Sequence, residues 1–279
     1  MSVASKNNPF VSVVMPVYNA ENIISNPIES ILNQTLKDFE LIIINDASTD
    51  KTLQVIEKFR KKDRRIKVIN NEKNMQMAHS LNVGISEAKS EFVARMDQDD
   101  IAFKDRLEVQ YNFLLRHPRT AIVGNDIITL DKDENVIGRR TYPTTSKQLK
   151  SIMFRYSPFA HSTVMFRKNA YERIGGYDRT KYPCEDIDLW FRLGQKYEFA
   201  SIPRALLNYR VVSTSSSHSN VLGTELMGFR IKIEAFKKYG YKPTLYDVIY
   251  NILQFVTMWF MPSIPRMRLY NFLRSRNLI

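Results

Sequence analysis

Two short segments of this 279-residue chain gather carboxylates at spacings suited to chemistry, and the first reads Asp97-Gln98-Asp99-Asp100. In an extended chain, residues i and i+2 point to the same side, so Asp97 and Asp99 would face the same space. Two carboxylates held this way repel each other unless a cation lies close to them. Mg²⁺ and Mn²⁺ suit ligand sets made only of oxygen. The segment therefore predicts either a divalent cation site or an acidic turn that caps the helix expected near Phe103.

The second acidic segment, Glu185-Asp186-Ile187-Asp188, stands at the start of a predicted helix. One interpretation is capping, because acidic side chains at a helix N-terminus complement its dipole. The other is a general base, because a carboxylate that faces a hydroxyl can take its proton as a new bond forms. Neighbouring acidic groups would raise the pKa of such a base and the helix N-terminus would lower it, so the residues leave the net direction open.

His161 is the histidine whose position invites a functional interpretation. It follows a loop and precedes an apolar run, Ser162–Phe166, that predicts a strand. A contact with a diphosphate or a metal and a structural hydrogen bond are both open for this side chain. The sequence contains no zinc-site spacing, phosphate-binding loop, dinucleotide fingerprint or nucleophile elbow, so we expect none of the activities that those motifs carry.

The first 130 residues alternate strand and helix signals. Short apolar runs predict strands at four places, residues 10–15, 39–44, 66–69 and 91–96. Helical patterns follow them near Asn26, after Asp50, at 77–88 and at 106–115. The alternation predicts an α/β fold with a mostly parallel, Rossmann-like sheet that helices cover on both faces.

Polar residues follow three of these strands. Asn19 follows the first, Asn45 and Asp46 follow the second, and Asp97 follows the fourth. The carboxyl ends of parallel strands lie at one edge of a sheet, where open α/β folds bind ligands. These residues are therefore expected to share one site.

The later part of the chain changes its pattern. We expect a strand at 121–129, a hairpin turn at 131–135 and a helix at 186–195. From Asn220 on, the chain is expected to be all helical, with one apolar stripe formed by Leu222, Leu226, Phe229, Ile233 and Phe236. A boundary near residue 215 would divide the chain into an α/β domain, 1–215, and a helical region, 216–279.

Composition places the chain among ordinary globular proteins, with 44% hydrophobic and 25% charged residues. The single cysteine, Cys184, allows no intrachain disulfide, which fits a reducing compartment. The first residues lack the apolar core of an export signal, so we expect a cytoplasmic protein. The longest apolar stretch, 245–264, is interrupted by polar residues and a proline, so we expect no membrane-spanning helix.

Positive charge is concentrated near the C-terminus. Residues 201–279 hold 11 Lys or Arg and 3 Asp or Glu, so they carry +8 of the net charge of +12. This predicts an anionic partner or a solvated basic surface. The basic residues gather in an apolar tail and not along a groove with stacking aromatics, so we expect no nucleic acid partner.

The tail itself could attach to an anionic membrane surface. It combines apolar and basic side chains: Trp259, Phe260, Met261, Ile264, Arg266, Arg268, Arg274 and Arg276. Such a combination suits peripheral binding to the inner face of a membrane. A packed helical tail and a homodimer interface are the alternatives.

Four motifs together resemble glycosyltransferase family 2. They occur in order within residues 10–212: Val13-Val14-Met15-Pro16-Val17-Tyr18-Asn19, Ile43-Ile44-Asn45-Asp46-Ala47-Ser48-Thr49-Asp50, Arg95-Met96-Asp97-Gln98-Asp99-Asp100 and Glu185-Asp186. The resemblance implies the GT-A fold and transfer of a sugar from a nucleotide donor with inversion of configuration. It also implies a role in bacterial surface polysaccharide synthesis, and a UDP-sugar as the donor.

The same resemblance implies roles by position. Pro16, Val17 and Tyr18 would line the nucleotide pocket, and Asp46 would accept a hydrogen bond from the base. Asp97 would lie near the ribose and the donor sugar, Asp99 would bind Mn²⁺ or Mg²⁺, and Asp186 would be the catalytic base. Further candidates for contact with the donor or its diphosphate are Arg95, His161 and Glu185.

The chain departs from the family pattern in three places. Ala47 stands where many members have glycine, Pro27 is unusual within the first helix, and residues 75–80 replace a stretch that often carries a glycine and an arginine. The acceptor implied by the resemblance is a glycan or a lipid-linked glycan. A nucleotide-binding regulatory module without transferase activity is the alternative function.

Overall fold

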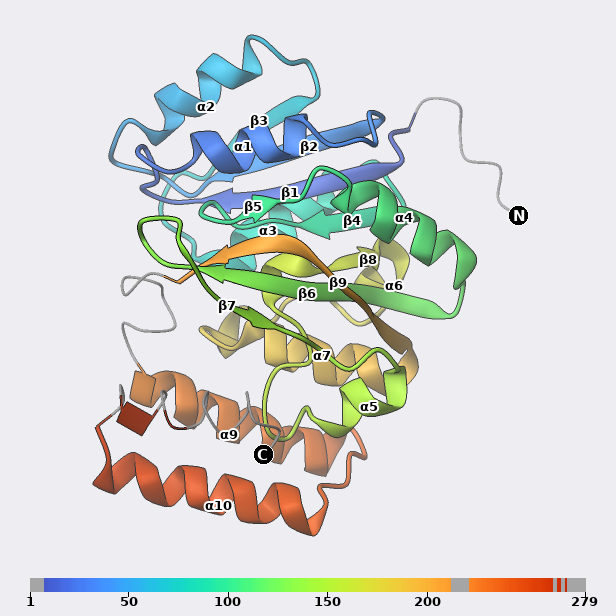
Figure 1. Cartoon of the computed structure of the whole chain (residues 1–279), viewed down its shortest axis with the longest axis vertical. Coiled ribbons are helices and arrows are strands. Elements are labelled where there is room, and N and C mark those ends of the chain that lie inside the picture. Colours follow the sequence, from blue (N-terminus) through green and yellow to red (C-terminus); the bar gives the residue numbers. More distant parts are fainter. Residues whose placement is uncertain (1–7, 212–220, 263–264, 267–268, 270–279) are drawn as a thin grey trace.

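The computed structural model describes residues 8–211, 221–262, 265–266 and 269. The predicted boundary near residue 215 lies outside these residues, as do Ile264, Arg268, Arg274 and Arg276. The described chain forms a nine-stranded sheet flanked by helices. Two further helices, α9 (Val221–Lys238) and α10 (Leu245–Phe260), lie one beyond the other at one end of the molecule (Figure 1).

One half of the sheet is parallel. Its strands run in the order β3 (Ile66–Asn70), β2 (Phe39–Asn45), β1 (Val11–Val17) and β4 (Phe92–Arg95). Every residue of β1 is buried, as expected for a strand that is covered on both faces. The four predicted strands are confirmed, with ends that differ by no more than two residues.

The other half is mostly antiparallel. Strand β8 (Met165–Arg167) pairs antiparallel with β4 and with β6 (Thr120–Leu130). Strand β9 (Glu198–Arg210) runs parallel to β6, and β5 (Ile101–Ala102) pairs antiparallel with β9. The predicted hairpin is present, because β7 (Val136–Arg140) pairs antiparallel with β6. Since β8 lies beside β4, the residues that precede β8 come close to the carboxyl end of β4.

The strand predicted at Ser162–Phe166 is partly wrong. Residues His161–Thr163 form a 3₁₀ turn, and β8 begins only at Met165. The Thr163 hydroxyl donates to the Ala160 carbonyl at 2.7 Å, and the Thr163 N–H donates to the same oxygen at 3.0 Å. Serine and threonine favour such local turns over strand pairing. The turn places His161 next to the end of β4.

The helices that cover the sheet include α1 (Ser25–Leu32), α2 (Thr52–Arg60), α3 (Met77–Ser86) and α4 (Arg106–Arg116). Pro27 lies in the first turn of α1, where its missing N–H costs no helical hydrogen bond. Helix α3 approaches the sheet closely at Gly84. A Cβ atom there would lie 2.5 Å from side-chain atoms of Val14 and Ile44, so only glycine allows this packing.

Shorter helices α5 (Ser146–Ser151) and α6 (Lys168–Arg173) precede α7 (Glu185–Lys196). A short turn, η2 (Arg179–Lys181), lies in the segment that joins α6 to α7. Gly175 and Gly176 follow α6 with φ angles of +84° and +69°, the left-handed backbone that often ends a helix at glycine.

Helix α9 packs on α7, and α10 lies outside α9 (Figure 1). Helix α10 begins at a capping box in which Thr244 and Asp247 exchange hydrogen bonds. The predicted apolar stripe of α9 does not face the core: Leu222, Leu226, Ile233 and Phe236 are exposed, and the buried positions are Gly228, Ile231 and Ala235. Among the described residues, no helix is both long enough and apolar enough to cross a membrane.

Candidate active site

The carboxyl ends of β1, β2 and β4 are tied together by side chains. The Tyr18 N–H donates to Gln98 Oε1 at 2.7 Å, and Gln98 Nε2 donates to the Tyr18 carbonyl at 3.2 Å. The Asn19 N–H donates to Ser48 Oγ at 3.1 Å, and Asn19 Oδ1 accepts from the Thr49 N–H at 2.8 Å. The polar residues that follow these strands therefore share one edge of the sheet, as predicted.

The three residues expected to line the nucleotide pocket on β1 differ in exposure. Pro16 and Val17 are buried in the sheet, where they pair with Ile44 and Asn45 of β2. Tyr18, just past the strand, exposes 41% of its surface. Its ring is thus available to a base, while Pro16 and Val17 support the strand end beneath it.

Asp46 is buried and holds the segment that leads into α3. Its Oδ1 accepts from Asn71 Nδ2 at 2.6 Å and from the Met75 N–H at 2.9 Å. Its Oδ2 accepts from the Gln76 N–H at 2.9 Å. A carboxylate has about four lone-pair sites, so one remains for a hydrogen bond from a base.

Backbone strain is concentrated at the same edge. Asn19, Ala47 and Gln76 have φ angles of +47°, +59° and +69°. Residues with a Cβ atom adopt this left-handed region at a cost, and such strain often occurs at functional sites. Ala47 thus adopts a backbone conformation that glycine would take at lower cost, and the hydrogen bond from Gln76 to Asp46 helps to hold the strained backbone of Gln76.

The first acidic segment forms a cluster of carboxylates. Asp97, Asp99 and Asp100 each offer an oxygen within 4.8 Å of the other two. Arg95 Nη1 forms a short ion pair with Asp97 Oδ2. The Asp100 Oδ2 atom is buried and has no hydrogen-bond partner in the described part of the chain. An all-oxygen donor set with an unsatisfied buried oxygen fits Mn²⁺ or Mg²⁺.

Burial and neighbouring negative charge raise the pKa values of Asp99 and Asp100. Burial, together with the charge of Asp97, raises the pKa of Asp99 to about 6. Burial and the charges of Asp97 and Asp99 raise the pKa of Asp100 well above its usual value. A bound cation would reverse these shifts, because it stabilises the ionised forms.

Two buried or half-buried arginines support this cluster, and sequence reasoning missed both. The Arg210 N–H, at the end of β9, donates to Asp100 Oδ1 at 3.0 Å, and Arg210 Nε donates to the Asp99 carbonyl at 3.3 Å. Arg106, at the start of α4, is fully buried and donates from Nη2 to the Arg95 carbonyl at 2.7 Å. Neither arginine lies in a motif that the sequence alone could single out.

The second acidic segment opens α7. Burial raises the pKa of Asp186 to about 6; Asp97 adds to the increase, and Arg95 opposes it. Burial and the charge of Asp186 raise the pKa of Glu185 to about 7. Here too Asp97 adds to the increase, and Arg95 opposes it. The net shift that the sequence left open is therefore upward. Arg95 and Asp97 act on both acidic segments, so the segments converge on one site although 88 positions separate Asp97 from Glu185.

His161 joins this site through Tyr177. Its Nε2 lies 2.6 Å from the Tyr177 hydroxyl, and its ring meets that of Trp190 edge to face. Burial, and then the charge of Arg95, lower the pKa of His161 well below its usual value. The imidazole is therefore neutral at pH 7. A contact between His161 and a nucleotide-sugar donor remains a prediction.

Comparisons with known proteins agree with this geometry. Residues 12–175 match the sequence profile described as Glycosyl transferase family 2. The chain is 41% identical to the putative glycosyltransferase EpsE of Bacillus subtilis over 189 residues, which cover 67% of each protein. It is 32% identical to the O-antigen biosynthesis glycosyltransferase WbnJ of Escherichia coli over 232 residues, which cover 82% of this chain and 89% of WbnJ.

Among solved structures, residues 1–349 of S. aureus TarS in complex with UDP-GlcNAc resemble this chain with a TM-score of 0.65 and 23% identity. The match covers 80% of this chain and 66% of the TarS chain. At this identity, the likeness shows the fold, which is GT-A, with a helical region at the C-terminus.

Proposed function

The chain belongs to glycosyl transferase family 2, and on this basis we propose that it moves a sugar from a nucleotide-diphosphate donor to an acceptor hydroxyl with inversion at the anomeric carbon. The observation that supports this most directly is the convergence of the two acidic segments around Arg95 and Asp97. One segment is suited to the diphosphate end of a donor, and the other is suited to an acceptor.

Asp186 acts as the general base. It takes the proton of the acceptor hydroxyl while that oxygen bonds to the anomeric carbon from the face opposite the diphosphate. The bond to the diphosphate breaks in the same step, and the leaving group carries away the electron pair. A single displacement inverts the anomeric centre without a covalent enzyme intermediate. Base assistance of this kind contributes about 10²–10⁴-fold.

Asp99, together with Asp97 and Asp100, would hold a Mn²⁺ or Mg²⁺ ion. Such an ion, when bound, supplies positive charge to a diphosphate leaving group. Asp97 orients Arg95 through their ion pair, and Arg95 adds a fixed positive charge between the two acidic segments. Tyr18 and Asp46 stand at the neighbouring strand ends and contact the base.

The names of two relatives support the proposed donor and acceptor. TarS has been crystallised with UDP-GlcNAc, which supports a UDP-sugar as the donor. WbnJ is named for O-antigen biosynthesis, which supports a glycan or lipid-linked glycan acceptor in bacterial surface polysaccharide synthesis.

The C-terminal helices attach the protein peripherally to the inner face of an anionic membrane. In α10 every residue that is mostly exposed is apolar, and Trp259 and Phe260 expose 67% and 84% of their surface. Lys237, Lys238 and Lys242 stand at the turn between α9 and α10. An apolar face with basic residues beside it complements an anionic lipid surface. The reaction would then occur in the cytoplasm, beside a lipid-linked acceptor.

A thermal-shift panel tests the donor part of this proposal. UDP-, GDP- and dTDP-sugars are compared with and without Mn²⁺, since a ligand that binds the native state raises its apparent stability. We expect the largest shift for a UDP-sugar with Mn²⁺, and we expect Asp99→Ala to remove the effect of the metal. An equal shift in the absence of Mn²⁺ would contradict the metal role.

Turnover separates the enzyme from its alternative, a regulatory module that binds nucleotides without transferring sugar. Release of UDP from the shifting donor, in the presence of a bacterial glycolipid extract as acceptor, is the expected result. A donor that binds tightly while no sugar is transferred or released would favour the regulatory module.

A further inference from the structure

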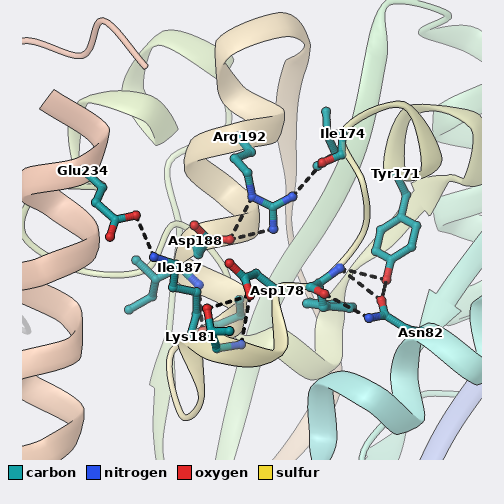
Figure 2. A network of polar contacts seen from close by, with 12 residues as sticks. Asn82, Tyr171, Ile174, Asp178, Lys181, Ile187, Asp188, Arg192 and Glu234 are labelled. Atoms are coloured by element: carbon teal, nitrogen blue, oxygen red, sulfur yellow. Dashed lines mark hydrogen bonds and ion pairs between the residues drawn. The ribbon is translucent and has the colours of Figure 1, made fainter. Parts of the chain in front are cut away.

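The segment between α6 and α7 leads directly to the proposed base, Asp186, which is the second residue of α7. This segment contacts three other elements. Figure 2 shows the polar contacts around it. On the α3 side, Asn82 Nδ2 donates to the Tyr177 carbonyl at 2.9 Å, and Asn82 Oδ1 accepts from the Tyr177 N–H at 3.1 Å. On the α7 side, Arg192 pairs with Asp188 and donates from Nη1 to the Ile174 carbonyl at 2.8 Å.

The third attachment comes from the C-terminal region. Lys181 Nζ lies 2.6 Å from Glu234 Oε2 on α9, and the two side chains are only 10% and 16% exposed. Lys181 is four residues before Glu185 and five before Asp186. The Cys184 thiol, next to Glu185, donates to the Thr224 carbonyl of α9 at 3.3 Å. Helix α9 thus contacts the segment immediately before the base.

The ion pair stands beside an open space. A pocket of about 510 Å³ is lined by residues of the segment, α7 and α9, among them Gly175, Asp178, Lys181, Arg192, Glu234 and Tyr239. Lys181 and Glu234 both line this space, so their ion pair lies at its wall and apolar packing does not enclose it on that side. Glu234 also meets Arg230 and Lys238, but those cations are exposed and lie on α9 itself, so they hold nothing in place outside the helix.

We propose that Glu234 is a positioning residue for the reaction: through Lys181 it fixes the segment that presents Glu185 and Asp186, so that the C-terminal helical region completes the active site. The inference rests on the proposed function of Asp186 as the base. The physical reason is geometric, because a displacement of about 1 Å in a reacting group can lower a rate about 100-fold. Glu234 touches neither donor nor acceptor in this scheme.

Helix α9 provides a matched control. Glu225 also forms a buried ion pair at 2.6 Å, with Arg266, and the side chains are 13% and 4% exposed. That pair joins α9 to the residues after α10 and does not reach the segment before α7. Glu225→Gln therefore removes a comparable ion pair from the same helix without releasing the proposed base.

The test compares full-length Glu234→Gln with Glu225→Gln. We expect Glu234→Gln to lower kcat for transfer about tenfold or more while the Kd for UDP with Mn²⁺ stays within about twofold. Glu225→Gln should keep kcat within about twofold although both variants melt at lower temperature. Lys181→Met should match Glu234→Gln, the double variant should be no worse than either single one, and Lys181→Arg should retain most of the activity.

Amide hydrogen exchange gives a readout that needs no turnover. Peptides that cover residues 177–188 should exchange faster in Glu234→Gln than in the wild type. Their exchange rate should be unchanged in Glu225→Gln. Equal exchange of these peptides in Glu234→Gln and Glu225→Gln overturns the inference. An equal kcat of the two variants overturns it as well. A wild-type protein without transfer activity would instead refute the proposed function, while the exchange result would still decide whether Glu234 holds the segment.

Discussion

At the scale of single residues, the proposed chemistry depends on carboxyl groups whose surroundings oppose ionisation. Asp186 lies in a partly buried position where burial raises its pKa to about 6, and the nearby Arg95 keeps that rise from being larger. A base with a pKa near the working pH is both mostly ionised and strong enough to accept a proton. At the start of α7, Asp186 is therefore better suited to the proposed role of general base than an exposed aspartate would be.

Removing this carboxylate should stop the reaction without affecting donor binding. We expect Asp186→Asn to lower kcat at least about 100-fold, because general-base assistance typically contributes 10²–10⁴-fold. Calorimetric titration with UDP and Mn²⁺ should give a Kd within about twofold of the wild type. A fully active Asn variant would remove Asp186 from the mechanism.

The pH dependence should show the same group. The base must be ionised, so kcat should fall as the pH decreases through about 6, the raised pKa of Asp186. Glu185→Gln is the control, because Glu185 titrates higher, at about 7. If the acidic limb near pH 6 disappears in Glu185→Gln, then Glu185 and not Asp186 is the group that titrates.

Single residues also mark where sequence reasoning ends. The motif residues Asp46, Asp97, Asp99 and Asp186 could be identified because each lies in a short recognisable segment. Arg210 could not, because it reaches Asp100 from an element that is distant in the sequence. Arg106 could not, because it lies in no recognisable motif and its guanidinium donates to the backbone carbonyl of Arg95. The direction of the pKa shift of Asp186 was equally out of reach, since it depends on how deeply the residue is buried.

At the scale of elements, the approach of α3 to the sheet determines where the strand-end segments lie. Helix α3 packs on β1 and β2. Its first residue follows Gln76, which Asp46 holds, and its middle carries Asn82, which holds Tyr177. A change in the distance between α3 and the sheet would therefore shift both Gln76, beside Asp46, and Asn82, beside Tyr177.

Two helical glycines allow this packing to be tested with a matched control. Gly84→Ala would place a Cβ atom 2.5 Å from Val14 and Ile44, whereas Gly228→Ala on α9 would meet no atom within 4 Å. We expect the first to destabilise the fold by about 1–3 kcal/mol through overpacking. The second should stabilise it by about 0.5–1 kcal/mol, because alanine favours a helix interior over glycine. Urea denaturation measures both, and equal effects would contradict the close approach.

Elements were predicted well where the local pattern decides them. The alternating runs of the first 130 residues gave the parallel strands and their covering helices, because a strand buried on both faces is apolar along its whole length. The 3₁₀ turn at His161–Thr163 was missed, since an apolar run of that length does not reveal a turn made by the Thr163 hydroxyl. The pairing of β8 between β4 and β6 is a long-range contact that no local pattern contains.

At the scale of the whole molecule, the exposed face of α9 and α10 is the feature that needs a partner. Eight apolar side chains of α10 that are more than 40% exposed lie before Trp259 and Phe260: Leu245, Tyr246, Val248, Ile249, Ile252, Leu253, Phe255 and Val256. Apolar surfaces of this extent mark interaction sites in soluble proteins. The helical character of this region could be predicted from its sequence, but the outward direction of its apolar side chains depends on how α9 docks on α7.

Flotation with liposomes tests the membrane as the partner. We expect the wild type to float with vesicles that contain anionic lipid, less so at high salt, and not with neutral vesicles. Trp259→Ser with Phe260→Ser should reduce binding at least about tenfold. Val136→Ser with Ile137→Ser, which removes two exposed apolar side chains from β7, is the control and should bind normally.

The same variants also test whether the partner is a second copy of the chain. If the apolar face forms a dimer interface, light scattering should show twice the monomer mass for the wild type. The variant with Trp259→Ser and Phe260→Ser should show the monomer mass. A dimer that does not float with any vesicle would replace the membrane proposal.

The contact between Lys181 and Glu234 also limits how sequences of this kind can be recombined. A chimera that joins residues 8–211 to the C-terminal helices of another protein would leave the Lys181 ammonium in a half-enclosed position without its counter-charge. A crossover placed between β9 and α9 would therefore need a glutamate at the position of Glu234, or a neutral residue in place of Lys181. Exchange of such tails to redirect a transferase to a new surface is expected to succeed only when one of these two conditions is met.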